Sequence, residues 1–466
     1  MATYTFTATP LTPIHVGTGE TLDTSRYVVH GGHLVEVSIA SLTGHLTTDE
    51  LEQFTRLAAG SDLKRLRDFL RHRADPERDG IARMAVSKAF ARTFEAKQFD
   101  PRNQLLVNPM TRNHQLGRPY LPGSAIKGAL RTALVSCLVE TDETFTRVPP
   151  RGDERRMQER ALGFEFRRGL HEDPFRTVKV ADALLPREAT VVSRFVNVHL
   201  DPEKKGSKGI EAWFERLLSR ADGVQPPAFT VEIEIDTERQ RRNGRNLVGM
   251  PLTLDDLREA ANRFYAGRFA AEWNRFHRLT HMKSAGALRR AFGANGALAL
   301  PGSPSILLRV GRFSHFESLS VDNWREGFCP QAKRPEHKRI KEGKTRNLCL
   351  LDNGEHVPFG WLLLTPVAGD PAEEVRRPPR FAPQPVRIPT AGAAGAGGGP
   401  LPAAPRPAAA PRLDPEELAR RQAMRLPQWL QEVKGYDLDQ VRRWARPGSP
   451  RIEALREEFR RWQRGE

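Results

Sequence analysis

Residues 119–134 carry the sequence Pro119-Tyr120-Leu121-Pro122-Gly123-Ser124-Ala125-Ile126-Lys127-Gly128-Ala129-Leu130-Arg131-Thr132-Ala133-Leu134. Pro122 and Gly123 interrupt the preceding chain, and Ser124 is a good N-cap because its hydroxyl can accept a hydrogen bond from a backbone N–H. Apolar residues then recur at every fourth position, which is the spacing of one buried helix face. They are Ile126, Leu130, Leu134 and Leu138. The stretch therefore predicts a turn followed by an amphipathic helix.

The first turns of this predicted helix break several local rules. Lys127 stands where a capping box would place Glu or Gln, and Arg131 follows one turn later. Cations near a helix N-terminus oppose the helix dipole at roughly 0.3–1 kcal/mol each, and Gly128 costs about 1 kcal/mol relative to alanine. Backbone N–H groups, a residue without a side chain and two cations together suit a phosphate. The alternative, which the residues support equally, is a buried helix whose cations extend to water.

Four segments resemble motifs of one family. Residues 122–131 closely resemble the "PGSSIKGALR" motif of the RAMP superfamily, the RNA-binding subunits of type III CRISPR effector complexes. Residues 11–20, Leu-Thr-Pro-Ile-His-Val-Gly-Thr-Gly-Glu, are similar to the N-terminal turn of that superfamily. Residues 343–346 (Gly-Lys-Thr-Arg) and 358–361 (Pro-Phe-Gly-Trp) resemble a later pair of motifs. That pair is typical of the subunit that ends the Csm-type (type III-A) backbone at the crRNA 3′ end, so the order of the four segments favours this capping subunit.

The resemblance implies an α+β fold of two ferredoxin-like (RRM-like) RAMP domains. It also implies crRNA, a neighbouring RAMP backbone subunit and the small helical subunit of the Csm complex as partners. Host nucleases, recruited or excluded during crRNA 3′-end maturation, are a further expected partner. Capping subunits of this kind are not regarded as catalytic, so neither a cofactor nor a metal is expected.

The composition is that of a basic intracellular protein. The 466 residues include 73 Lys and Arg against 57 Asp and Glu, a formal net charge of +16, which favours a polyanionic partner. The three cysteines (Cys137, Cys329 and Cys349) form no disulfide framework, which fits a reducing compartment. The first residues do not resemble a secretory signal, and no apolar run approaches the ~20 residues that span a bilayer. A cytoplasmic protein with no membrane partner is expected.

The N-terminal part alternates strand and helix patterns. Residues 3–9 alternate polar and apolar side chains as a half-buried strand does, and 10–20 form a turn-rich loop. Residues 26–37 predict a β-hairpin whose turn is Gly31-Gly32, and residues 47–73 predict helices. This mixture favours helices on one face of an antiparallel sheet. Residues 140–188 are charged and irregular, and we interpret them as an insertion or long loop.

The second half predicts another domain of the same kind. Strands are expected at 189–198, 229–235, 306–313 and 360–367, a basic hairpin tip or loop at 239–245, and a long helix at 254–278. The predicted division is an N-terminal RAMP domain over 1–188, with the insertion, and a C-terminal RAMP-like domain over 189–369. A linker over 370–412, rich in Pro, Ala and Gly, and a basic helical tail over 413–466 follow.

Residues 333–346 are the densest basic segment. Such blocks are most often solvated loops, but Gly343-Lys344-Thr345-Arg346 lies within the family motif. The segment is not a nucleotide-binding P-loop, because Lys338 stands where that motif requires glycine. We therefore expect contacts to the phosphate backbone of RNA, which are independent of sequence and sensitive to salt. The predicted RNA-binding residues are His15, Gly17, Gly19, Gly123, Ser124, Lys127, Gly128, Arg131, Lys344, Thr345 and Arg346.

Catalytic alternatives are weaker. Some RAMP relatives cleave RNA with a histidine near the first strand, and His15 is the matching residue for an endoribonuclease. Another alternative is a RAMP subunit at the opposite end, or in the repeating backbone, of a type III complex. The spacings of a conceivable zinc set match no tight ligand pattern. That set is Cys329, His337, Cys349 and His356. Asp23, Asp255 and Asp256 form no recognisable metal-dependent nuclease arrangement, and the last two suit the acidic first turn of a helix.

Overall fold

The structure is a computed structural model. It describes residues 1–60, 62–98, 100, 103, 105–141, 145, 154–203, 212–293, 297–298, 300, 303–322, 324–328, 339–374, 386–387, 459 and 462–463. The chain divides into two compact units, Met1–Ala391 and Gly392–Glu466, and nearly all described residues belong to the first. The predicted linker over 370–412 and the predicted tail over 413–466 therefore lie almost wholly outside the described residues.

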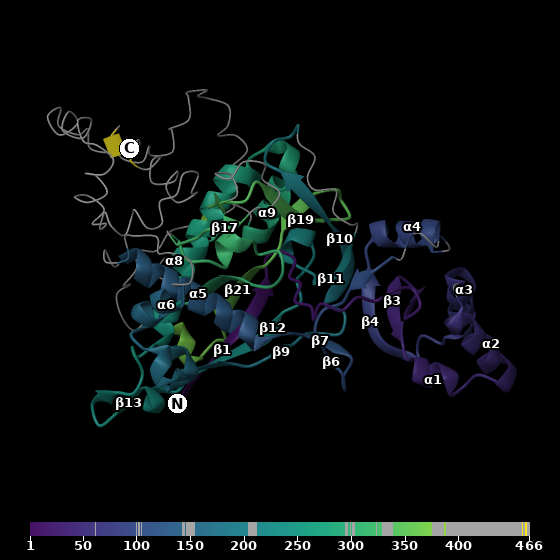
Figure 1. Cartoon of the computed structure of the whole chain (residues 1–466), viewed down its shortest axis with the longest axis horizontal. Coiled ribbons are helices and arrows are strands. Elements are labelled where there is room, and N and C mark those ends of the chain that lie inside the picture. Colours follow the sequence, from purple (N-terminus) through teal and green to yellow (C-terminus); the bar gives the residue numbers. More distant parts are fainter. Residues whose placement is uncertain are drawn as a thin grey trace, which may run out of the picture. The chain divides into compact units, whose positions relative to one another are not determined.

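The first sheet of the described residues is antiparallel and has β1 at its centre (Figure 1). Its strand order is β16-β21-β1-β12-β8. The bounds are β1 (Ala2–Pro10), β8 (Val178–Val180), β12 (Phe229–Ile235), β16 (Ile306–Arg309) and β21 (Trp361–Pro366). The strands predicted from the alternation at 3–9 and 229–235 are thereby confirmed, and every apolar residue of β12 is buried.

Two long helices cover this sheet. α5 (Gly123–Thr141) and α8 (Leu254–Glu272) pack against each other, and both contact β16 (Figure 1). A π-helical turn, Trp273–His277, continues α8, and α9 (Ala285–Phe292) follows. The main hydrophobic core lies here, and its largest fully buried side chains include Phe6, Tyr265, Phe269 and Trp361. A capping box between Thr253 and Asp256 starts α8, as the acidic first turn indicates.

The strands of the first sheet come from both sides of the predicted boundary at residue 188. β1 and β8 belong to the predicted N-terminal domain, whereas β12, β16 and β21 belong to the predicted C-terminal domain. The two predicted halves therefore share a sheet and a core, and residue 188 does not separate two sheets. The mixed α and β architecture agrees with the expected class, while two complete ferredoxin-like domains stay a prediction.

The second sheet of the described residues has the strand order β2-β3-β4-β10-β11-β5, and β19 and β20 extend it from the second half of β10. The β4–β10 and β11–β5 pairs are parallel, and the others are antiparallel. The bounds are β2 (Tyr27–His30), β3 (His33–Val37), β4 (Gly80–Val86), β5 (Val107–Asn108), β10 (Thr190–His199), β11 (Trp213–Leu217), β19 (Thr345–Leu350) and β20 (His356–Pro358). The predicted Gly31-Gly32 turn is confirmed, with φ values of 55° and 77°.

Four helices accompany this second sheet: α1 (Ile39–Thr43), α2 (Thr48–Ala59), α3 (Leu63–Arg73) and α4 (Lys88–Lys97). Small separate cores hold them against the strands. The helical region predicted at 47–73 is confirmed, with a break at Gly60 between α2 and α3. α2 begins with the capping box of Thr47 and Glu50, in which each side chain satisfies a backbone N–H of the other.

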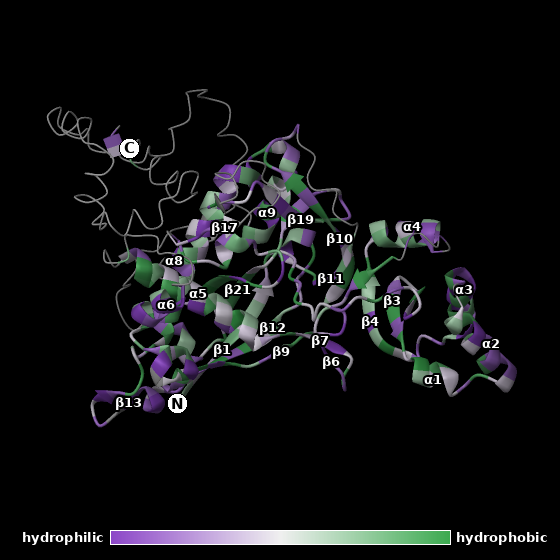
Figure 2. Ribbon diagram, viewed as in Figure 1, coloured by the Kyte–Doolittle hydropathy of each residue, from purple (hydrophilic) through white to green (hydrophobic). Residues whose placement is uncertain are grey.

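The described residues between 140 and 188 include regular elements where an insertion or long loop was predicted. They contain α6 (Glu154–Leu162), short 3₁₀ turns and two strands, one of which joins the first sheet. The remaining short elements are β6 (Arg112–Asn113), β7 (Arg118–Leu121), β9 (Ala183–Leu184), α7 (Thr237–Gln240), β13 (Arg241–Arg242), β14 (Arg245–Asn246), β15 (Ala297–Leu298), β17 (Gly327–Phe328), β18 (Arg339–Ile340) and β22 (Val386–Arg387). β13 and β14 form the predicted basic hairpin, which is largely hydrophilic (Figure 2).

Candidate nucleic-acid interface

The helix that carries the Pro-Gly-Ser motif begins two residues earlier than predicted. α5 starts at Gly123, so Ser124 is the second helical residue and the expected N-cap at Ser124 is wrong. The Gly123 N–H donates to Oδ1 of Asp182 at 2.7 Å. A Cβ on Gly123 would lie 2.0 Å from the Val180 carbonyl oxygen. Gly123 therefore permits close approach of the protein's own backbone, and its N–H is already satisfied.

The next turns of α5 expose a small polar strip. Ser124 and Gly128 are exposed, and Lys127 is half-buried. A Cβ on Gly128 would meet nothing within 4 Å, so no packing within the described residues requires glycine there. A glycine in a helix interior costs about 1 kcal/mol relative to alanine, and open space beside it leaves room for a partner's backbone. We call Ser124, Lys127, Gly128 and Thr132 the α5 strip.

Lys127 carries the positive charge of the α5 strip. Within the described residues its side chain forms no ion pair and no hydrogen bond. Burial lowers the pKa of its ammonium group, the Asp173 carboxylate opposes that shift, and the Arg131 charge adds to it. A partly dehydrated ammonium group without a counter-ion gains more from an incoming phosphate than a fully hydrated one does. Lys127 is thus the residue of this helix best placed to bind an anion.

Arg131 is already engaged by the protein. Its Nη1 donates to both oxygens of Asp173 at 2.9 Å, and its Nε donates to Gln158 at 3.2 Å. The guanidinium also lies over the Phe175 ring, 5.1 Å from the ring centroid. Because Asp173 compensates this charge, the predicted phosphate contact of Arg131 would require partial rearrangement. That contact stays a prediction.

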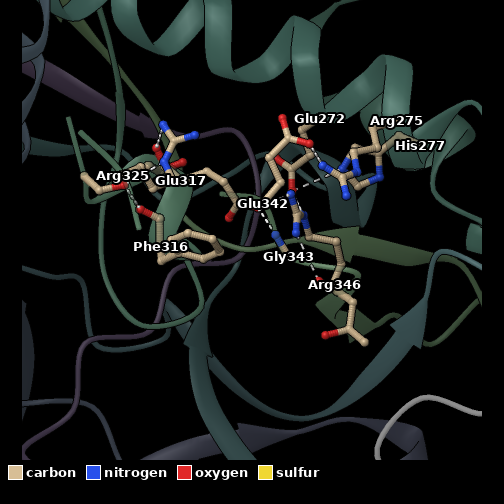
Figure 3. Close-up of polar contacts among 12 residues, drawn as sticks. Glu272, Arg275, His277, Phe316, Glu317, Arg325, Glu342, Gly343 and Arg346 are labelled. Carbon is tan, nitrogen blue, oxygen red and sulfur yellow. Dashed lines mark hydrogen bonds and ion pairs between the residues drawn. The ribbon is translucent and has the colours of Figure 1, made fainter. Parts of the chain in front are cut away.

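The residues of the Gly-Lys-Thr-Arg segment differ in exposure. Arg346 is buried, Lys344 is exposed, and Gly343 and Thr345 are intermediate. Arg346 is buried, and its guanidinium donates to Oε1 of Glu272 at 2.8 Å and to Oε1 of Glu317 at 3.0 Å (Figure 3). The same Glu317 oxygen accepts the Gly343 N–H at 2.8 Å. The guanidinium carbon of Arg346 also lies over the Phe276 ring, 3.9 Å from the ring centroid. Its burial argues against the predicted phosphate contact and assigns it to joining β19 to the end of α8.

Lys344 and Thr345 contact β10 and the residue after it through their backbones. Lys344 is exposed, and no side-chain ion pair holds it within the described part of the chain. Its carbonyl accepts the Leu200 N–H at 2.8 Å, and Thr345 pairs with His199 of β10. The contacts of Gly343 and Arg346 with Glu317 and Glu272 fix the start of β19, where Lys344 is exposed. Lys127 lies on a helix that covers the first sheet, so the two cations belong to different layers.

The loop 11–20 contains a buried histidine. Nδ1 of His15 lies 2.6 Å from the Glu215 carbonyl oxygen, which can only accept, so Nδ1 carries the proton. Burial lowers the pKa of the imidazole. Nε2 is buried without a hydrogen-bond partner in the described residues, and a Cβ on Gly17 would lie 2.7 Å from it. Gly17 thus accommodates His15, whereas Gly19 is exposed and has a φ of 92°.

These positions weaken the catalytic alternatives. Because His15 is buried, it would have to become accessible before it could act as a general base on RNA. Asp23 forms an Asx turn with Ser25, Asp255 pairs with Arg258, and Asp256 caps α8. Among the described residues, no group of three or more His, Cys, Asp or Glu side chains could hold a metal ion. Cys329 and His337 of the rejected zinc set lie outside those residues.

Sequence reasoning missed the acidic partners of the predicted cations. Asp173 holds Arg131, and Glu272 and Glu317 hold Arg346. No motif marks these three carboxylates, and each is distant in sequence from its arginine. Glu272 is buried at the end of α8, and a buried carboxylate requires a cation to pair with it, but its burial could be seen only in the structure.

The chain belongs to the RAMP superfamily, whose family model matches residues 7–258. It is similar in structure to a chain of the cryo-EM structure of the Csm-crRNA-target RNA ternary complex in a type III-A CRISPR-Cas system. That match has a TM-score of 0.54 and 18% identity, and it covers 78% of this chain and 100% of the other. The crystal structure of T. onnurineus Csm5 is similar with a TM-score of 0.50 and 18% identity, over 76% of this chain and 99% of that one. No curated protein matches the sequence.

Within the described residues, no helix has the length and apolar character needed to cross a membrane.

Proposed function

We propose that this protein is a non-catalytic, RNA-binding subunit of a type III-A CRISPR ribonucleoprotein. The observation that carries the proposal is the α5 strip, where Lys127, which has no ion pair among the described residues, lies beside exposed Gly128 within the motif shared with the RAMP superfamily. A cation beside an open glycine lets a ribose-phosphate backbone approach the helix closely. The resemblance to a chain of a Csm-crRNA-target RNA complex supports crRNA as the ligand.

The finer assignment is the subunit that caps the backbone at the crRNA 3′ end. The similarity to T. onnurineus Csm5, over nearly the whole of that chain, and the late Gly-Lys-Thr-Arg motif support it. In this role the protein contacts a neighbouring RAMP backbone subunit and the small helical subunit. It also contributes to crRNA 3′-end maturation and antiviral defence, in which host nucleases trim the RNA up to the cap.

The cations that serve this function are those that form no ion pair within the described part of the chain. Lys127 and Lys344 contact phosphates, Ser124 and Thr345 offer hydroxyl groups beside them, and Gly128 permits the approach. Arg131 contributes to the local potential while it remains paired with Asp173. Such contacts recognise the backbone and not the bases, which suits a subunit that binds any guide sequence.

The test is reconstitution of the complex with this chain present, absent or replaced by Lys127→Ala. The complex with the wild-type chain should hold one copy of it and crRNA with a discrete 3′ end. Omission should leave the other subunits assembled around crRNA whose 3′ ends are heterogeneous. Several copies per complex would instead assign the chain to the repeating backbone, and cleavage of repeat RNA by the purified chain would contradict the non-catalytic role.

A further inference from the structure

Aromatic rings gather beside the loop 11–20, outside the residues already assigned. Phe195 of β10 and Phe313 of the loop after β16 stack with their ring centroids 5.1 Å apart and an interplanar angle of 29°. Phe214 contacts both rings edge-on, at 5.2 Å and 5.0 Å. His15 and Phe359 complete the base of the cluster. Phe214 and Phe359 are buried, but Phe195 and Phe313 remain half-exposed at the margin of the main core.

The loop that presents Phe313 has an unfavourable backbone. Phe313 has a φ of 67° and His315 a φ of 61°, in the left-handed region that costs a bulky residue roughly 1–2 kcal/mol. Tertiary contacts impose this shape. The Arg312 N–H donates to the His15 carbonyl at 2.8 Å, and the Ser314 hydroxyl donates to the Gly311 carbonyl at 2.7 Å. Strain that the surrounding structure maintains is concentrated at binding and catalytic sites.

Arg312 covers the rings with a cation that has no counter-ion among the residues that the structure describes. Its side chain is exposed, and its guanidinium carbon lies 5.3 Å from the Phe214 centroid and 5.4 Å from that of Phe313. No carboxylate of the described residues forms an ion pair with it. The nearby Glu215 carboxylate is buried and already pairs with Arg112. A planar guanidinium held on aromatic faces, with its charge uncompensated, suits a ligand that is flat and anionic.

We infer that Phe195, Phe313 and Arg312 form a stacking site for one base of single-stranded RNA, and this inference rests on the proposed RNA-binding function. RNA bases that are not paired stack on aromatic rings and on guanidinium planes, whatever the sequence. The site adjoins the loop 11–20, because a Cβ on Gly311 would lie 3.1 Å from Cγ2 of Val16. A protein partner fits less well, since the strongly exposed apolar side chains of the described residues, such as Ile81 and Leu116, lie on other segments, with the exception of Leu319.

Two substitutions separate stacking from charge and from folding. Arg312→Lys retains the charge but removes the plane, and Arg56→Lys is the control, since Arg56 is an exposed arginine of α2 without an aromatic contact. Affinity of the full chain for fluorescent polyuridine is measured by anisotropy across a salt series. Arg312→Lys should bind on the order of tenfold more weakly, with an unchanged salt slope, and Arg56→Lys should bind as the wild type does. An RNA with abasic sites should bind all three proteins equally.

A second variant and a spectroscopic signal keep the test independent of folding. Phe195→Leu retains an apolar side chain, and its thermal unfolding is compared with that of the wild type. 2-Aminopurine placed along the RNA should be quenched at one position by the wild type, and not by Phe195→Leu or Arg312→Lys.

Salt-dependent binding that neither substitution nor base removal weakens would overturn the stacking site and leave RNA binding intact. If the wild type binds no RNA, both proposals fail. Loss of a neighbouring subunit with RNA binding unchanged would assign this surface to protein and overturn the inference.

Discussion

Nε of Arg346 donates to Oε1 of Glu272 across 2.8 Å, and both side chains are buried. Glu272 also accepts from Arg309 at 2.6 Å, so one carboxylate joins β19, β16 and the end of α8. Arg309 and Arg346 hold the pKa of Glu272 well below its usual range, against the opposing effect of burial. Arg346 belongs to the Gly-Lys-Thr-Arg motif, which suggests RNA contact, but its side chain acts inside the protein.

Arg346→Ala should destabilise the protein without changing the RNA affinity of the folded fraction. Removing one member of a buried ion pair leaves an uncompensated charge, at a cost of about 3–5 kcal/mol. Urea unfolding measures the loss. Lys344→Ala, two residues earlier and exposed, is the matched control and should change the free energy of unfolding by less than about 0.5 kcal/mol. Unchanged stability of Arg346→Ala together with weakened RNA binding would contradict the interior role.

Lys127→Ala should weaken RNA binding while leaving stability nearly unchanged. Each phosphate contact to a single strand contributes about 0.7 to the slope of log affinity against log salt, so the slope should fall by about that amount. Binding titrations at several salt concentrations give the slope. Arg176→Ala removes another exposed cation from a nearby turn and serves as the control. Equal slopes for wild type and Lys127→Ala would remove Lys127 from the interface.

Gly128→Ala should raise the free energy of unfolding and lower the affinity for RNA. The added Cβ meets nothing within 4 Å and the backbone is helical, so the protein should gain roughly 0.5–1 kcal/mol. RNA affinity should fall, because the methyl group occupies the space that the proposed backbone approach requires. Thermal unfolding and anisotropy on the same preparation give both quantities. Gly123→Ala provides the contrast, since its Cβ would fall 2.0 Å from the Val180 carbonyl and should destabilise the fold. A stabilised Gly128→Ala that binds RNA normally would show that the glycine has no role in binding.

The free energy of unfolding should fall as the pH drops below about 6.5, the ordinary pKa of histidine. Burial lowers the pKa of His15, and burial with nearby arginines lowers the pKa of His315 to about 3. Between pH 6.5 and these lowered values, the unfolded chain binds protons that the folded protein excludes, so acid favours unfolding. His15→Asn can keep a donor to the Glu215 carbonyl but cannot titrate, so its stability should decline less between pH 7.5 and pH 5. Denaturant titrations at the two pH values test this, and parallel declines would contradict it.

The elements that depend on local pattern could be predicted from the sequence, and those that depend on distant contacts could not. The alternation in β12, the Gly31-Gly32 turn and the apolar face of α8 each follow from residues close together in the chain. The mixing of strands across residue 188 depends on the pairing of β1 with β12 and β21, which no local period encodes.

The same limit applies to the candidate site. Lys127 and Lys344 face outward, whereas Arg131 and Arg346 face carboxylates that lie 42 and 74 residues away in sequence. Charge alone does not distinguish an arginine that binds a ligand from one that pairs internally. At Gly123 and Gly17 the group that approaches closely is the protein's own backbone or side chain, and their predicted contacts with RNA stay predictions.

We propose that the protein binds RNA through backbone contacts and does not cleave it. The most direct measurement incubates the purified full chain with end-labelled single-stranded RNA, with and without Mg²⁺, and follows both the bound fraction and the RNA length across a salt series. We expect intact RNA, affinity that falls steeply with salt, and weaker binding by Lys127→Ala/Lys344→Ala. Cleavage that His15→Asn abolishes, or binding that neither salt nor the double substitution alters, would contradict the account.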